Sequence, residues 1–194
     1  MDKEFAGLTA IITGAGSGIG LAVAKGLKER GATVFGFDIS QGEMAPFATF
    51  VKCDIADAAS VELAFTEFKK ASNKLDILIN NAGIGSLTTV EKESDENWHK
   101  VLNVNVVGTA RVSRSAIPLL RTSKSAAIVN TASIAGTDGI PNRAAYSASK
   151  GAVLALTLAM ATDHLADGIR VNAVNPATTD TPWVKRLLDQ SPDA

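Results

Sequence analysis

Apolar residues occur along this chain in short unbroken runs that alternate with longer segments of helical periodicity. The runs predict six β-strands, at 8–13, 33–37, 49–53, 75–79, 125–131 and 169–175. The segments between them predict helices at about 21–30, 58–70, 95–120 and 143–166. Strands that are apolar throughout are covered on both faces, and strands separated by helices need crossover connections. The pattern therefore predicts a doubly wound α/β fold, in which a parallel, Rossmann-like sheet lies between two layers of helices.

Length and charge narrow the class of protein. A chain of 194 residues fits one domain, 1–194, and its 46% hydrophobic and 20% charged residues are typical of a globular protein. The net charge of -1, without a long run of Lys or Arg, argues against a nucleic-acid partner. No uninterrupted apolar stretch reaches the roughly 18 residues of a membrane span, and the charged start has no signal-peptide pattern. We therefore expect a cytoplasmic protein that binds no membrane.

The residues that bind metals or form disulfides are sparse. Cys53 is the only cysteine, which excludes an internal disulfide, and its apolar surroundings predict a buried thiol. No cluster of His, Cys or carboxylate residues has metal-ligand spacing, so we expect no catalytic metal. His99 and His164 match no catalytic pattern, and we interpret both as solvated helix residues.

A glycine-rich turn follows the first predicted strand and precedes a helix, with the sequence Thr13-Gly14-Ala15-Gly16-Ser17-Gly18-Ile19-Gly20. Glycines in such a turn let backbone N–H groups approach a pyrophosphate, and the helix N-terminus favours its negative charge. Asp38 ends the second strand about 20 residues beyond Gly18, which completes the pattern of a dinucleotide site.

Asp38 also indicates which nicotinamide cofactor binds. A carboxylate accepts hydrogen bonds from a ribose 2'-hydroxyl and repels a 2'-phosphate, and neither Ile39 nor Ser40 supplies a basic partner for a phosphate. NAD is therefore the expected cofactor. The alternative is that Asp38 only caps a loop.

Several motifs are similar to those of one known family. They are the glycine turn, Asp54-Ile55, Asn80-Asn81-Ala82-Gly83, Asn105, Ser133 and Tyr146-Ser147-Ala148-Ser149-Lys150. In these residues the sequence resembles the short-chain dehydrogenase/reductase family, from about Leu8 to Trp183. The resemblance implies an oxidoreductase whose cofactor contacts are Gly14, Ser17, Gly18, Ile19, Gly20, Asp38, Asp54, Ile55, Asn81, Ala82, Gly83, Tyr146, Lys150, Pro176 and Thr181.

Tyr146 and Lys150 carry the expected chemistry. They are four residues apart in a predicted helix and therefore share a face. A nearby ammonium lowers the pKa of a tyrosine from its ordinary value of about 10, so Tyr146 can be a general base in alcohol oxidation and a general acid in ketone reduction. A lone tyrosine can also be a plain core or surface aromatic.

The resemblance assigns roles to the residues around Tyr146. It implies that Lys150 binds the nicotinamide ribose, that Ser133 holds the substrate oxygen and that Asn105 orders a water relay to Lys150. It also implies that Asn80 and Asn81 shape the adenosine side of the cofactor site, where a plain strand-end turn is the alternative.

The C-terminal part departs from the family pattern. Ala177 occupies a position where the family usually has glycine, and if a positive φ is needed there, alanine costs about 1 kcal/mol. The family usually continues beyond the length of this chain, so we expect the sheet to lack the final strand. A catalytically weak NAD-binding or scaffold protein is therefore an alternative to an enzyme.

The substrate pocket is only partly visible in the sequence. Trp183 offers a flat apolar wall, and Asn142 and Arg143 offer polar contacts near Tyr146. These residues suit a small polyol or sugar about as well as a 3-oxoacyl thioester. We prefer the polyol or sugar, because NAD is used more often for oxidation than for biosynthetic reduction.

The predicted helices at 95–120 and 143–166 carry small and apolar residues beyond one core face. Those of the second helix include Gly151, Ala152, Ala155 and Ala159. Close packing of helices between subunits uses such residues. The resemblance implies homodimers or homotetramers that form through these two helices, and an alanine-rich internal helix is the alternative.

Overall fold

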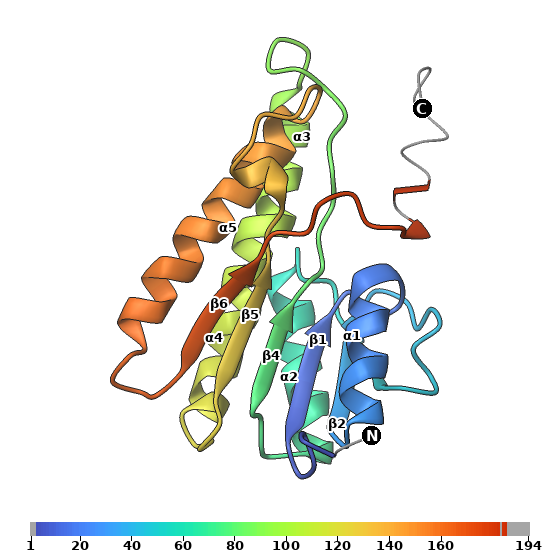
Figure 1. Cartoon of the computed structure of the whole chain (residues 1–194), viewed down its shortest axis with the longest axis vertical. Coiled ribbons are helices and arrows are strands. Elements are labelled where there is room, and N and C mark those ends of the chain that lie inside the picture. Colours follow the sequence, from blue (N-terminus) through green and yellow to red (C-terminus); the bar gives the residue numbers. More distant parts are fainter. Residues whose placement is uncertain (1–2, 183, 186–194) are drawn as a thin grey trace.

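A parallel sheet forms the centre of the structure, a computed structural model that describes residues 3–182 and 184–185 (Figure 1). Six strands of this part of the chain pair in the order β3-β2-β1-β4-β5-β6. Their bounds are β1 Thr9–Thr13, β2 Thr33–Asp38, β3 Thr49–Lys52, β4 Ile77–Asn80, β5 Ala127–Thr131 and β6 Arg170–Val174. The order reverses between β1 and β4, and in doubly wound sheets the ligand-binding crevice lies at the carboxyl ends of the strands at this point. The predicted strands and fold class are confirmed.

The helices connect these strands in the predicted places. They are α1 Gly18–Glu29, α2 Ala58–Ala71, α3 Asp95–Leu102, α4 Thr109–Leu120 and α5 Ala144–Asp163. Between α3 and α4 the chain forms a π-helical segment, η1 (Asn103–Gly108), and after β5 a short 3-10 helix, η2 (Ile134–Gly136). The predicted continuous helix at 95–120 is therefore interrupted by a wider turn.

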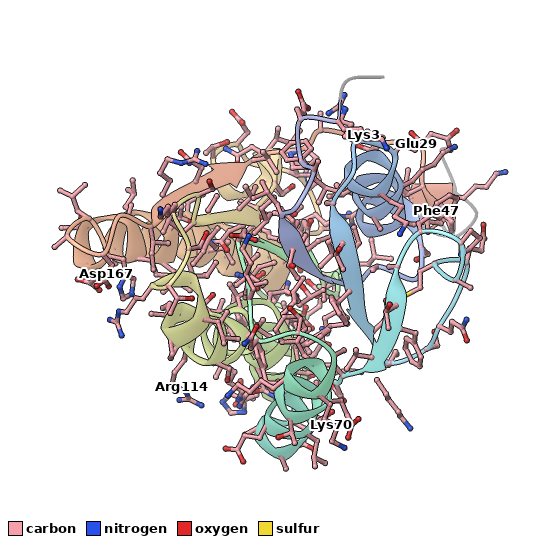
Figure 2. All side chains as sticks on the ribbon, turned by 90° about the horizontal axis from the view of Figure 1, so that it is seen from below. Lys3, Glu29, Phe47, Lys70, Arg114 and Asp167 are labelled. Carbon is pink, nitrogen blue, oxygen red and sulfur yellow. The ribbon has the colours of Figure 1, made fainter. Side chains whose placement is uncertain are left out.

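Two buried clusters fix the layers on the faces of the sheet. Alternate strand residues point to opposite faces, so Ile12 of β1 packs toward α1 and its neighbour Ile11 packs toward α2, α4 and α5. Figure 2 shows the same arrangement, with the blue helix α1 near Glu29 on one side and the helices that carry Lys70 and Arg114 on the other. The three-layer α/β/α architecture is confirmed.

Helix α5 is the most apolar of these elements. By length and composition alone it could cross a membrane, a test that the core helix of a soluble protein also passes. Here α5 packs against β5, β6 and η2. Its first turns carry Tyr146 and Lys150, and this packing brings them to the carboxyl end of the sheet.

Candidate active site

The glycine turn lies against the residues that follow β4. The N–H of Gly14 donates to the carbonyl of Phe37 (2.8 Å), and Gly14 has a φ of +68°. A Cβ at Gly14 would lie 2.9 Å from the Cα of Ala82, and a Cβ at Gly20 would overlap the carbonyl oxygen of Gly14. The turn can therefore close this tightly only with glycine at both positions.

Asn81 holds the turn in place from the neighbouring strand. Its side-chain amide donates to the carbonyls of Thr13 (3.1 Å) and Gly14 (3.2 Å). The hydroxyl of Thr13 in turn accepts the N–H groups of Asn81 (2.9 Å) and Ala82 (3.0 Å). The side chain of Asn81 thus supports the glycine turn, and the backbone from Asn81 to Gly83 lines the crevice.

The start of α1 fits an anionic group such as a pyrophosphate. Ser17 is the N-cap residue of α1, and its side chain makes no capping hydrogen bond. The first N–H groups of a helix have no partner within the helix, and they bind anions well. Gly18 has a φ of +54°, and a Cβ there would lie 3.5 Å from side-chain carbons of Thr181, which covers the turn. The residues Gly14, Ser17, Gly18, Ile19 and Gly20 are thus brought together.

Asp38 lies beside this turn at the end of β2. One carboxylate oxygen accepts the N–H of Gly16 (2.9 Å), and the other accepts the N–H of Ser40 (3.3 Å). Asp38 therefore does cap the loop, as the alternative interpretation expected. Each carboxylate oxygen has two lone pairs, so both can still accept a hydrogen bond from a ribose hydroxyl.

The residues after β3 form one wall of the crevice. Asp54 caps its own loop by accepting the N–H of Ala56 (2.9 Å), and Ile55 is buried against Gly108 of η1. Cys53 is 2% exposed, as predicted, and burial together with the charges of Asp54 and Asp38 raises the pKa of its thiol to about 12. The thiol is therefore uncharged near neutral pH.

Lys150 is buried next to the ring of Tyr146. Its side chain donates to the carbonyl of Thr131 at the end of β5 (2.7 Å), and its Nζ lies 5.7 Å from the centroid of the Tyr146 ring. Only 5% of Lys150 is exposed, and burial lowers the pKa of its ammonium to about 8.

Tyr146 forms a side-chain hydrogen bond with Ser133. Burial raises the pKa of Tyr146 above its ordinary value, while the bond to Ser133 and the charge of Arg143 lower it by less. The expectation that Lys150 lowers this pKa is therefore wrong for the protein alone. The reason is that burial of the phenol outweighs the interactions that favour the phenolate.

Asn105 clamps the site from the π-helical segment. Its side-chain oxygen accepts the N–H of Ile84 (2.8 Å), and its amide donates to the carbonyl of Ile84 (2.8 Å) and to the hydroxyl of Ser149 (2.9 Å). Ser149 donates to the carbonyl of Tyr146 (2.7 Å). Asn105 therefore ties the loop after β4 to the turn of α5 between Tyr146 and Lys150. Its expected part in a water relay stays a prediction.

Asn80 does not lie where the resemblance placed it. Its amide is buried under the helices, where it donates to Ser113 of α4 (3.0 Å) and to Asn130 of β5 (2.9 Å). Neighbouring residues of a strand point to opposite faces, so Asn80 points into the core. The expectation that it shapes the adenosine side is therefore wrong.

The segment after β6 runs from the carboxyl end of that strand toward α1 (Figure 1). The carbonyl of Pro176 accepts the N–H of Ile134 (3.3 Å), next to Ser133, and Thr181 is 9% exposed over the glycine turn. Ala177 does not have a positive φ, so the expected cost of a missing glycine is not incurred. Trp183, the expected apolar wall, lies outside the described residues.

The two histidines differ from each other. His99 is exposed, as expected, but His164 is half-buried, and its Nδ1 lies 2.8 Å from a carboxylate oxygen of Asp167. The interpretation of His164 as a solvated residue is therefore wrong. No group of three His, Cys, Asp or Glu that could hold a metal occurs within 3–182 and 184–185.

Comparisons with known proteins agree with this geometry. The family model described as short chain dehydrogenase matches residues 8–192. The chain is 40% identical to a 3beta-hydroxysteroid dehydrogenase of Mediterraneibacter gnavus, over 91% of this chain and 67% of that protein. The solved structure of the ligand-free aldohexose dehydrogenase of Thermoplasma acidophilum matches with a TM-score of 0.92 and 32% identity, over 98% of this chain and 74% of that one.

A second solved structure is a 3-ketoacyl-(acyl-carrier-protein) reductase of Brucella melitensis in complex with NADH. It matches with a TM-score of 0.87 and 35% identity, over 94% of this chain and 80% of that one. The chain belongs to the short-chain dehydrogenase family. It is an oxidoreductase of the class that interconverts secondary alcohols and ketones.

Proposed function

We propose that this protein is an NAD-dependent dehydrogenase with Tyr146 as its general acid and base. The observation that carries the proposal is the contact of Tyr146 with Ser133, beside the buried Lys150 and at the open end of the glycine-turn crevice. A proton-transfer group, a hydroxyl that can hold the substrate oxygen and a dinucleotide cradle thus meet at one edge of the sheet.

The residues of the crevice suit the parts of a dinucleotide. The turn from Gly14 to Gly20 would hold the pyrophosphate, and Asp38 would bind the ribose diol and repel a 2'-phosphate. Further contacts would come from Asp54, Ile55, Asn81, Ala82, Gly83, Pro176 and Thr181. When bound, the nicotinamide supplies the hydride acceptor in oxidation and the hydride donor in reduction.

Tyr146 would take the proton of the substrate hydroxyl during oxidation and return a proton to the carbonyl oxygen during reduction. Ser133 would position that oxygen, since its hydroxyl already contacts the phenol. Lys150 would bind the ribose of the nicotinamide, and Asn105 would keep Tyr146 and Lys150 in register through Ser149. These four residues are the proposed catalytic set.

The preferred substrate class is a small polyol or sugar, in the direction of oxidation. The likeness to an aldohexose dehydrogenase supports this choice. The likeness to a 3-ketoacyl reductase supports a second candidate, reduction of a 3-oxoacyl thioester. We also propose that the protein acts in the cytoplasm as a homodimer or homotetramer, with no nucleic-acid or membrane partner.

A screen of NAD reduction tests the proposal. Polyols, aldohexoses and 3-hydroxyacyl thioesters are offered to the wild type and to Tyr146→Phe, and cofactor affinity is measured by fluorescence titration. We expect steady turnover of one class, a loss of about 100- to 10,000-fold in Tyr146→Phe and unchanged NAD affinity. Substantial activity in Tyr146→Phe would show that the proton moves elsewhere. NAD binding without turnover of any class would favour the catalytically weak alternative.

A further inference from the structure

Arg143 brings a positive charge to the substrate side of Tyr146. It is the N-cap residue of α5, and Tyr146 is the third helical residue after it, so the two occupy the neighbouring N-cap and N3 positions at the start of the helix. Its side chain is half-buried. The charge of Arg143 also acts on the phenol, whose pKa it lowers. Arg143 therefore neighbours Tyr146 at the start of α5, and its charge acts on the phenol.

The charge of Arg143 has no carboxylate partner in the described part of the chain. No Asp or Glu oxygen of residues 3–182 and 184–185 lies within 4.0 Å of its guanidinium. Its one hydrogen bond to another group of these residues runs from Nη1 to the carbonyl of Asn142 (3.0 Å). A guanidinium carries five N–H donors, so most of them are available to a ligand.

The turn before α5 accepts a hydrogen bond from this side chain. Asn142 has a φ of 56°, a conformation that no other non-glycine residue of the described chain adopts. Asparagine tolerates this left-handed conformation better than most residues. The carbonyl oxygen of Asn142 accepts a hydrogen bond from an N–H of the Arg143 guanidinium. This bond limits the rotamers that Arg143 adopts.

The neighbouring loop adds an apolar surface, and its Glu93 is engaged by other groups of the loop and of α3. The carbonyl of Thr88 accepts the N–H of Ala144 (3.2 Å), so the loop after β4 lies against the start of α5. Leu87 on this loop is 42% exposed. Glu93 is bound to the hydroxyl of Thr88 and to the amide of Asn97. This carboxylate is therefore already engaged by its own loop.

We propose that Arg143 is the anion-recognition residue of the substrate site and that the substrate is a secondary alcohol or ketone that carries a carboxylate. The planar guanidinium matches a carboxylate in a bidentate pair, and Leu87 offers a surface for a short carbon skeleton. This inference rests on the proposed function and deepens it. It narrows the polyol class to acidic members, such as sugar acids and hydroxy acids.

The first test reads Tyr146 directly, because Tyr146 is the only tyrosine in the chain. Its phenolate absorbance is titrated in the wild type, Arg143→Gln, Arg143→Lys and the control Arg170→Gln, with and without NAD. Arg170 is exposed and begins β6, so it lies at the amino ends of the strands, whereas Tyr146 lies at their carboxyl ends. The probes are 3-hydroxybutyrate and its uncharged methyl ester, and circular dichroism confirms that each variant is folded.

We expect 3-hydroxybutyrate to raise the pKa of Tyr146 in the wild type, Arg143→Lys and Arg170→Gln, because a paired Arg143 no longer stabilises the phenolate. The acid should not shift this pKa in Arg143→Gln, and the ester should not shift it in any form. An equal response in Arg143→Gln and the wild type, or no response in the wild type, would overturn the inference. This measurement needs no turnover.

The second test compares kcat/KM for the two probes. Loss of a hydrogen bond to a charged group predicts that Arg143→Gln lowers kcat/KM for the acid by roughly 10- to 100-fold and leaves the ester within about threefold. Equal losses of kcat/KM for the acid and the ester in Arg143→Gln, or equal wild-type values for both, would reject Arg143 as the anion site. The proposed function would not be affected by that result. A wild type that shows the titration response but oxidises no alcohol would reject the proposed function and keep the anion site.

Discussion

Burial controls the ionisable groups of the candidate site more strongly than charge pairing does. It lowers the pKa of Lys150 to about 8 and raises the pKa values of Tyr146 and Cys53. The spacing of Tyr146 and Lys150 predicts their common face, but it carries no information on desolvation. Burial therefore favours the uncharged form of each of these three groups.

Lys150→Met should change how stability depends on pH. A base whose pKa is lowered by folding binds fewer protons in the folded than in the unfolded state, here between about pH 8 and its ordinary 10.5. The unfolding free energy of the wild type should therefore rise relative to that of Lys150→Met by up to about 3 kcal/mol as pH rises through this window. Urea unfolding at several pH values measures the difference between the two.

The exposed Lys52 supplies the control for this experiment, since Lys52→Met should follow the wild type at every pH. A constant gap between the wild type and Lys150→Met from pH 7 to 10 would mean that the ammonium is not desolvated.

Asp38 combines a structural role with the proposed cofactor selectivity, and two substitutions separate them. Asp38→Asn keeps a side-chain oxygen for the N–H of Gly16 but removes the charge that repels a 2'-phosphate. We expect its preference for NAD over NADP to fall by about 10-fold with little loss of stability. Asp38→Ala should lose both the preference for NAD and the stability that the bond to Gly16 provides. Fluorescence titration with each cofactor and thermal unfolding measure these effects, and an unchanged preference in both variants would contradict the assignment.

At the scale of elements, the sequence predicts what depends on local pattern. The apolar runs locate all six observed strands, and the glycine turn is evident because its backbone needs glycine. The π-helical segment is not predictable in this way. It places Asn105 against the backbone of Ile84 and the hydroxyl of Ser149, partners that lie 21 and 44 residues away. The position of Arg143 beside Tyr146 likewise depends on the turn at Asn142.

Two glycines of α1 should respond to alanine with opposite signs. A Cβ at Gly20 would overlap the carbonyl oxygen of Gly14, whereas a Cβ at Gly26 would meet no atom within 4 Å. Gly20→Ala should therefore cost about 1 to 3 kcal/mol of unfolding free energy and weaken cofactor binding. Gly26→Ala should add about 0.5 to 1 kcal/mol, because alanine has the better helix propensity. Denaturant unfolding measures the change in unfolding free energy for both variants. Changes of the same sign would show that the glycine turn is looser than described.

At the scale of the whole molecule, one exposed apolar region lies on the outer side of α4 and α5. A groove between these helices is lined by the apolar residues Ala110, Ile117, Pro118, Leu156 and Met160, together with Ser113, Arg114 and Arg121. Leu158 is 71% exposed on α5, and Ala155 and Ala159 beside it are also exposed. A contiguous apolar surface of this kind favours association between subunits. It is the surface on which the proposed dimer or tetramer depends.

Leu158→Glu should convert the assembled protein to a smaller species. A carboxylate buried at a subunit contact without a partner costs several kcal/mol, which is enough to dissociate a dimer at micromolar concentration. Leu63 of α2 provides a matched control, since it is a leucine of 67% exposure on a helix that does not line the groove. Leu63→Glu should keep the wild-type mass. Light scattering of the three proteins at equal concentration makes the comparison. A monomeric wild type would remove the proposed assembly, and an unchanged mass in Leu158→Glu would move the contact away from this face of α5.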